Sequence, residues 1–220
     1  MITDQYLSND IEPLSLDDTV LTAIEKMNKL HLDLLPVIYN NHLVNYAGID
    51  VIEHLDHHIK LSELELYAPV LPFVHTSQHL LHALTHLKSL NVSLMAVLDE
   101  NGDYQGVLKT KDVVKAISNS LSIRSSGSII VIRVKPIDYS LSDLSRIIEY
   151  SDAKILGFFI FEVEGSDELE VHLKLNTGVL KHILATLERY DYKVVQYFNR
   201  EDLADDMDQR FENLMNYIDI

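Results

Sequence analysis

The chain has 220 residues, of which 47% are hydrophobic, so it can bury the core of one large domain or of two ordinary ones. It carries 18 lysine and arginine residues against 34 aspartate and glutamate residues. The resulting net charge of −16 argues against binding to nucleic acid or anionic membrane surfaces. The absence of cysteine excludes disulfides, thiolate nucleophiles and thiolate metal sites. With no signal peptide pattern and no long apolar stretch, we expect a cytoplasmic protein.

An internal repeat runs through the first half of the chain. Residues 14–41 align with residues 74–101 at a constant offset of 60 positions and without a gap. The matched positions are Leu21, Ala23, Met27, Leu30, Leu34, Val37, Ile38 and Asn41 with Leu81, Ala83, Leu87, Leu90, Leu94, Val97, Leu98 and Asn101. They form an apolar stripe at helical spacing followed by a short apolar run, which is typical of an amphipathic helix that leads into a buried strand. The repeat therefore predicts two copies of one folding unit, packed sheet against sheet.

Each copy is expected to fold as βαββα over about 60 residues. In the first copy the expected elements are a helix at 19–30 after Asp17 and Asp18, strands at 34–39 and 43–47, and a helix that starts near Asp50. In the second copy they are a helix capped by Ser77, strands at 94–98 and 104–108, and a helix at 111–119.

The run from Arg124 to Ser128 is short and polar, so we predict a flexible linker and a domain boundary there. Beyond it we expect strands at 129–135, 155–163, 169–175 and 192–198 and helices at 141–150 and 179–190. This βαββαβ order is the ferredoxin-like plan, and Ser140 with Asp143 resembles a capping box. The expected domains are residues 1–60, 61–124 and 125–198, followed by an acidic amphipathic helix at 199–220.

The duplicated unit resembles the CBS domain, and two such units followed by an ACT domain resemble the acetoin-utilisation protein AcuB family. The motifs that carry the resemblance are Leu35-Pro36-Val37 in the first repeat and Gly106-Val107-Leu108 followed by Asp112 in the second. It covers nearly the whole chain except the acidic tail. The resemblance implies an α/β (α+β) fold class, with tandem CBS repeats followed by a ferredoxin-like ACT domain.

Paired CBS domains commonly bind adenosine nucleotides in clefts between the repeats. The resemblance therefore implies a regulatory module that binds AMP, ATP or S-adenosylmethionine and signals to a partner protein. The implied nucleotide-binding residues are Asp112, Lys109, Lys111, Gly106, Val97 and Asp50. Asp112 is expected to hold ribose hydroxyls and Lys109 or Lys111 to contact a phosphate. The alternatives are a carboxylate that complements a helix dipole for Asp112 and a solvated surface charge for Lys109.

No nucleophile motif or phosphate-binding glycine loop is present, so we expect no enzyme activity. ACT domains often bind amino acids at the loop after their first strand, usually beside a glycine. The corresponding loop, residues 136–140, has none, so the expected role of this domain is to form a homodimer through its sheet edges.

Two other features leave alternatives open. Two groups of histidines stand out, namely His54, His57 and His58, and then His75, His79, His82 and His86. The last three share one helix face, where they either chelate a metal in a metal sensor or line an exposed flank or interface. The tail, residues 199–220, has seven acidic residues against two basic ones. Its apolar stripe of Leu203, Met207, Phe211, Leu214 and Ile218 predicts a helix that packs onto its own dimer or recruits a partner. A structural adaptor with vestigial clefts is therefore the main competing function.

Overall fold

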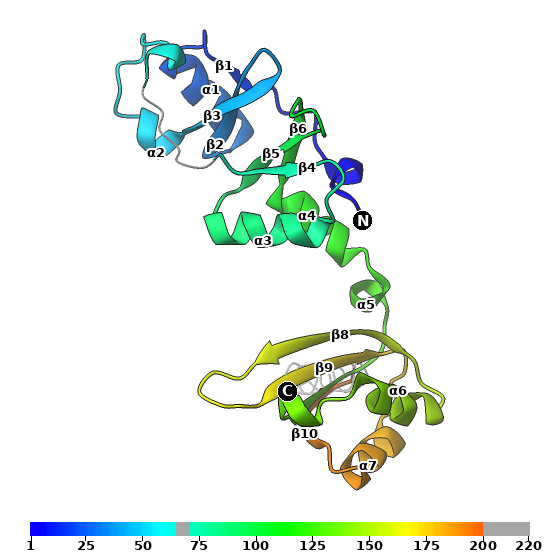
Figure 1. Cartoon of the computed structure of the whole chain (residues 1–220). Helices are drawn as coiled ribbons and strands as arrows, with labels where there is room; N and C mark the ends of the chain where they lie inside the picture. Colours follow the sequence, from blue (N-terminus) through cyan, green and yellow to red (C-terminus); the bar gives the residue numbers. More distant parts are fainter. Residues whose placement is uncertain (65–70, 200–220) are drawn as a thin grey trace, which may run out of the picture. The chain divides into compact units, whose positions relative to one another are not determined.

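The computed structural model describes residues 1–64 and 71–199 and divides into two compact units, Met1–Ser118 and Asn119–Ile220 (Figure 1). The acidic helix predicted after Asn199 lies outside the described residues. Within the described ranges, no helix combines the length and the apolar composition that crossing a bilayer requires.

The first repeat is built on a three-stranded sheet. Its elements are β1 (Leu14–Ser15), α1 (Val20–Leu30), β2 (Leu34–Tyr39), β3 (His42–Gly48) and α2 (Ile49–Ile52). The sheet order is β1-β2-β3, with β1 parallel to β2 and β3 antiparallel to it. Thr19 caps α1 by accepting a hydrogen bond from the backbone N–H of Thr22 at 3.2 Å.

The second repeat has the same element order and strand pairing. Its elements are β4 (Phe73–His75), α3 (Leu80–Leu90), β5 (Leu94–Leu98), β6 (Tyr104–Lys109) and α4 (Thr110–Ser118). The prediction of Ser77 as a helix cap is wrong, because α3 begins later in the chain. The cap is His79, whose Nδ1 accepts a hydrogen bond from the N–H of Leu81 at 3.3 Å.

The two repeats share a hydrophobic core. Buried side chains of the first repeat, among them Leu35 and Val37, belong to the same cluster as Ala96 and Val107 of the second. The hydroxyl of Tyr46 also joins the repeats, because it donates to the carbonyl of Pro72 and accepts from the N–H of Ala96 at 2.8 Å. The packing between repeats that the duplication predicted is therefore present.

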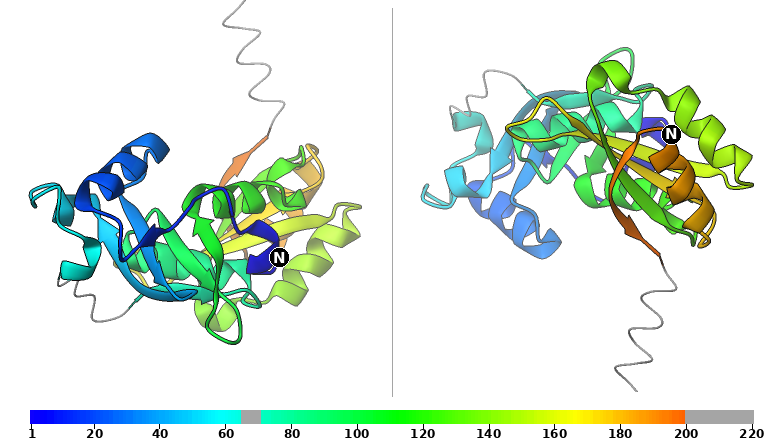
Figure 2. Two further views of the ribbon diagram at one scale, coloured as in Figure 1. Left: turned by 90° about the horizontal axis from the view of Figure 1, so that it is seen from above. Right: turned by 90° about the horizontal axis from the view of Figure 1, so that it is seen from below.

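The N-terminal segment, residues 1–10, runs along the second repeat before the chain enters the first (Figure 2). It begins with a short helix, η1 (Thr3–Tyr6), and the backbone N–H of Thr3 donates to the carbonyl of Gln78 at 2.9 Å. Further along, Ser8 forms an antiparallel bridge with Val107 of β6. Because β6 is an edge strand of its sheet, this bridge covers part of an otherwise open edge.

The second unit contains a four-stranded antiparallel sheet with its two longer helices on one face (Figure 1). Its elements are α5 (Leu121–Arg124), β7 (Ile129–Val134), η3 (Pro136–Asp138), α6 (Leu141–Tyr150), β8 (Ile155–Glu162), β9 (Leu169–Leu175), α7 (Lys181–Arg189) and β10 (Lys193–Phe198). The sheet order is β10-β7-β9-β8, so the element order βαββαβ expected from the sequence is observed. Ser140 caps α6 by accepting from the N–H of Asp143 at 3.3 Å.

The end of the run from Arg124 to Ser128, for which a flexible linker was predicted, packs against the sheet of the second unit. Ser128 is buried and its hydroxyl donates to the carbonyl of Thr177 at 2.6 Å. A Cβ atom on Gly127, which has φ +138°, would lie 2.0 Å from the carbonyl oxygen of Leu175. The small residues therefore allow close packing against the end of β9, and the division between the units falls earlier, after Ser118.

Candidate functional site

Lys109 and Asp112, two of the residues expected to bind a ligand, lie together where β6 runs directly into α4. Lys109 ends the strand and Asp112 lies in the first turn of the helix. Because no loop separates the two elements, the Nζ of Lys109 lies 3.5 Å from Oδ2 of Asp112. This junction therefore presents one cation and one carboxylate on the same side.

Lys109 is buried, with only 6% of its surface exposed. The alternative in which it is a solvated surface charge is therefore wrong. A buried ammonium group requires anionic or hydrogen-bonding partners, because water no longer solvates it. Its Nζ donates to both carboxylate oxygens of Asp10, at 3.2 and 3.3 Å.

Asp112 is partly exposed, and its Oδ2 accepts a hydrogen bond from the hydroxyl of Ser8 at 3.2 Å. Its place in the first turn of α4 also favours a negative charge there, because the helix dipole is positive at that end. The carboxylate therefore stabilises α4 and still has accessible surface with which to accept hydrogen bonds from a ligand.

Gly106 lies under the N-terminal segment. The backbone groups of Ser8 and Val107 exchange two hydrogen bonds, of 2.7 and 3.1 Å. A Cβ atom on Gly106, which has φ +147°, would lie 2.5 Å from Oδ1 of Asn9 and 3.0 Å from the carbonyl oxygen of Ser8. Glycine is therefore required here by the close approach of the segment, as well as by the backbone conformation.

The two partners of this buried ion pair differ in their contact with solvent. The side chain of Asp10 is 72% exposed, whereas that of Lys109 is 8% exposed. The hydrogen bond from Lys109 lowers the pKa of the Asp10 carboxyl below its ordinary value of 3.8, so this group stays charged at neutral pH. Asp10 is thus an anionic partner that can leave Lys109 for water, whereas Lys109 cannot leave its site without breaking the packing.

The other expected residues do not join this cluster. Val97 is fully buried in the core beneath α3 and α4, so it offers no surface to a ligand. Lys111 is exposed on α4, and Asp50 is exposed at the start of α2 in the first repeat. Among the described residues, no contact joins Asp50 to Lys109 or Asp112.

Sequence reasoning missed Ser8, Asn9 and Asp10. Ser8 and Asp10 are 104 and 99 positions away from their partners Asp112 and Lys109, and the available signal was only a short polar run before the first strand. That run is equally typical of a solvated loop, so the pattern by itself did not reveal a binding role.

The histidine groups do not form a metal centre within residues 1–64 and 71–199. No group of three or more His, Cys, Asp or Glu side chains there is arranged to hold a metal ion. His79, His82 and His86 are all exposed, which agrees with their position on the outer flank of α3. The geometry of this part of the chain gives the metal-sensor alternative no support.

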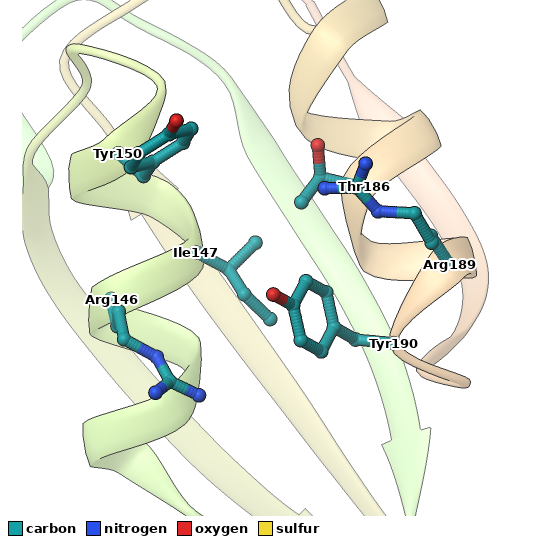
Figure 3. Close-up of a pocket in the computed structure, with 6 residues that line it drawn as sticks. All are labelled: Arg146, Ile147, Tyr150, Thr186, Arg189 and Tyr190. Carbon is teal, nitrogen blue, oxygen red and sulfur yellow. The ribbon is translucent and has the colours of Figure 1, made fainter.

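The second unit has a hollow of about 340 Å³ between α6 and α7 (Figure 3). Ile147 and Thr186 are nearly buried at its base, and the ring of Tyr190 lies across the gap between the helices. Arg146 pairs with Asp143 at 3.0 Å, while the guanidinium of Arg189 lies 5.6 Å from the centre of the Tyr190 ring. Both cations are thus already in intramolecular contacts, and the hollow is separate from the loop at 136–140.

Comparison with known proteins bears on the first unit. Residues 65–119 match the family model of the CBS domain, a range that contains the second repeat. No curated protein matches the sequence.

Three solved structures are similar to this chain. A CBS domain pair/ACT domain protein from Thermotoga maritima has 19% identity and a TM-score of 0.50, over 55% of this chain and 99% of that chain. The CBS domains of a transcriptional regulator from Streptococcus pneumoniae have 15% identity and a TM-score of 0.48, over 52% and 98%. CBSX2 in complex with AMP has 20% identity and a TM-score of 0.44, over 53% and 95%. The family model thus covers about a quarter of the chain, and the Thermotoga structure shares its fold with little more than half of it.

Proposed function

We propose that the chain is a regulatory module whose first unit is a CBS domain pair that binds an adenosine nucleotide of the AMP, ATP or S-adenosylmethionine type beside Lys109 and Asp112. One observation carries this proposal. A buried lysine at the junction of β6 and α4 is paired with an exposed, exchangeable carboxylate and lies next to a second, partly exposed carboxylate. Such a group of side chains can exchange one anionic partner for another.

Each side chain has a distinct role in the proposed complex. Asp112 accepts hydrogen bonds from the ribose hydroxyls, because an ionised carboxylate is an acceptor with two oxygens. Lys109 donates a charge-assisted hydrogen bond to a phosphate oxygen, which takes the place of the Asp10 carboxylate that accepts this bond in the absence of ligand. The protein holds the ligand and changes no bond in it, so the function is regulatory and not enzymatic.

The remaining parts of the proposal concern the second unit and the partners. The βαββαβ element order supports an ACT domain at residues 125–198 and thereby membership of the AcuB family. We expect the module to act in the cytoplasm and to transmit ligand binding to a partner protein. Ligand binding alters such a partner only if the ligand binds one arrangement of the protein more tightly than another.

A thermal-melt panel tests the nucleotide proposal on the full chain. A ligand at 100 times its dissociation constant adds about 2.7 kcal/mol to the free energy of unfolding, which shifts the melting temperature by several degrees. We expect a shift with at least one of AMP, ATP and S-adenosylmethionine, and we expect Asp112→Ala to abolish it.

Two matched variants make this result specific. Asp143→Ala removes an acid from the first turn of α6 in the second unit and should leave the nucleotide shift intact. Asp50→Ala removes the acid that stands in the corresponding place in the first repeat, and it should also leave the shift unchanged. A panel in which no nucleotide or nucleoside shifts the melt would overturn the proposal.

A second candidate function, a homodimeric adaptor, is favoured by the β8 edge of the second unit. Four consecutive apolar residues there are exposed, namely Phe158 (41%), Phe159 (47%), Ile160 (41%) and Phe161 (53%). Phe158 aligns with Leu173 and Phe159 with His172, so the exposed side chains alternate between both faces of the sheet. No charge lies between Ile155 and Phe161, so two copies of β8 can pair without bringing like charges together.

Sedimentation velocity tests the adaptor. We expect a dimer at micromolar concentration, which Ile160→Lys converts to a monomer because it places two like charges at the shared edge. Glu162→Gln, at the end of the same strand, is the control and should leave the dimer intact. A wild-type chain that stays monomeric at about 100 times that concentration would exclude this edge as the interface.

A further inference from the structure

We infer that Asp10 determines whether the site accepts a phosphorylated ligand, and that a phosphate which reaches Lys109 releases the N-terminal segment from β6. The inference rests on the proposed function and names the regulation of that same site. It follows because the N-terminal segment binds Lys109 and Asp112, the same two side chains that the proposed ligand binds.

The first step concerns Lys109. Its ammonium group has three N–H donors. The nitrogen donates to both oxygens of Asp10 and lies 3.5 Å from Oδ2 of Asp112. The side chain is only 8% exposed, so almost none of its surface is free to bind a further anion. A phosphate oxygen can therefore bond to Lys109 only by taking the place of the Asp10 carboxylate.

The second step concerns Asp112. Its Oδ2 accepts from the hydroxyl of Ser8 and lies within ion-pair distance of Lys109. A ribose hydroxyl that donates to this oxygen takes the place of the Ser8 hydroxyl, a neutral donor that is replaced at little cost. A nucleoside without phosphate thus displaces one weak contact, whereas a nucleotide also displaces the charged one.

The third step concerns what then holds the N-terminal segment. Its polar side-chain contacts with this junction are those of Asp10 with Lys109 and of Ser8 with Asp112, and its backbone contact is the pair of hydrogen bonds between Ser8 and Val107. Tyr6 and Leu7 also pack against the core cluster of the second repeat. A nucleotide removes both polar side-chain contacts. The segment is then held here by one pair of backbone hydrogen bonds and by the packing of Tyr6 and Leu7, so it opens more often and uncovers the edge of β6.

The chemistry predicts a contrast between AMP and adenosine. Asp10→Asn removes the charge that competes with the phosphate and keeps the size of the side chain. We expect this variant to bind AMP about tenfold more tightly than wild type, a figure set by the strength of charge-assisted hydrogen bonds and reduced because Asp10 is largely solvated. Its affinity for adenosine should stay within about twofold of wild type, because adenosine does not reach Lys109.

Calorimetric titration of the full chain with AMP and with adenosine is the experiment. Asp10→Glu keeps the charge, so its affinities for AMP and for adenosine should match those of wild type. Glu12→Gln removes a charge from the same stretch, and Glu12 lies 3.6 Å from Lys26 and away from Lys109, so it should change neither affinity. Melting curves without ligand establish that each variant is folded.

Hydrogen exchange gives an independent readout. Saturating AMP should increase exchange at the amides of Ser8 and Val107 in wild type, whereas saturating adenosine should not. If AMP binds wild type and Asp10→Asn equally and leaves these amides protected, the inference is wrong while the proposed function stands. If neither AMP nor adenosine binds any of the variants, the proposed function itself fails.

Discussion

Replacing Lys109 by methionine is the sharpest perturbation of the first unit. Methionine occupies a similar volume and keeps the apolar packing of the buried stem, so the change isolates the ammonium group. Its loss leaves the carboxylates of Asp10 and Asp112 close together without the cation between them. We expect the full chain to be less stable at pH 7.

The size of the change in the free energy of unfolding follows from how far each partner is exposed to solvent. A hydrogen bond to a charged group contributes about 1.5–3 kcal/mol, and losing one member of a fully buried pair costs about 3–5 kcal/mol. Asp10 is 72% exposed and recovers much of its hydration, so we expect Lys109→Met to cost about 2 kcal/mol. Asp10→Asn should cost about 1 kcal/mol, because Asp112 still accompanies the lysine. The double variant should reveal a coupling of about 1 kcal/mol.

Urea denaturation followed by far-ultraviolet circular dichroism measures these differences, and hydrogen exchange at β6 assigns them to the first unit. The hydrogen bond from Lys109 lowers the pKa of Asp10 in the folded protein. The coupling energy between the two residues is therefore fully present above the ordinary aspartate pKa of 3.8, and it is lost as the pH falls through the lowered pKa of the folded protein. A coupling near zero at pH 7, or a Lys109→Met variant as stable as wild type, would refute the assignment of this lysine to a structural ion pair.

Three further substitutions test individual packing contacts, and a fourth, Gly102→Ala, is a control. Tyr104→Phe should not lower the free energy of unfolding at pH 7, because the buried hydroxyl has no hydrogen-bond partner among the described residues. Burial raises the pKa of Tyr104 to about 12, so ionisation of this tyrosine in the unfolded chain lowers the free energy of unfolding as the pH rises from 10 to 12. Urea titrations at both ends of that window should show that the variant reduces this loss. Gly106→Ala should cost about 2 kcal/mol in the same assay because its new methyl group meets the N-terminal segment, whereas Gly102→Ala, with φ +84° and no atom within 4 Å, should cost about 1 kcal/mol. Gly157→Ala should displace α5 from β8, because its Cβ atom would lie 2.4 Å from the Cβ of Ser122, and hydrogen exchange in α5 reports the loss.

The local pattern of apolar residues was sufficient to predict most of the secondary structure. The strands at 34–39, 94–98 and 169–175 and the helix at 141–150 have the bounds that the sequence predicted. The first two strands are continuous apolar runs, and the other two elements carry apolar residues at the period of a strand or a helix, so no distant contact is needed to recognise them. The duplication likewise predicted two βαββα repeats with a common core, because neither repeat covers its own apolar face.

The candidate site was only partly predictable. Lys109 and Asp112 are three positions apart at the junction of a strand and a helix, so their proximity follows from sequence and local geometry. Their partners Asp10 and Ser8 lie about a hundred positions earlier, and only the path of the folded chain brings them to β6. For the same reason the burial of Lys109 had no local signature, because a lysine that follows an apolar strand is ordinarily solvated.

The sequence alone thus determined the repeats, the periodic elements and the position of one cation beside one carboxylate, because each depends on residues near in the chain. The tertiary structure decided that the lysine is buried, that the N-terminal segment covers Gly106, and that Gly127 and Ser128 pack against the end of β9. Burial and pairing depend on which distant segments meet, and a linear pattern of residue types does not specify that.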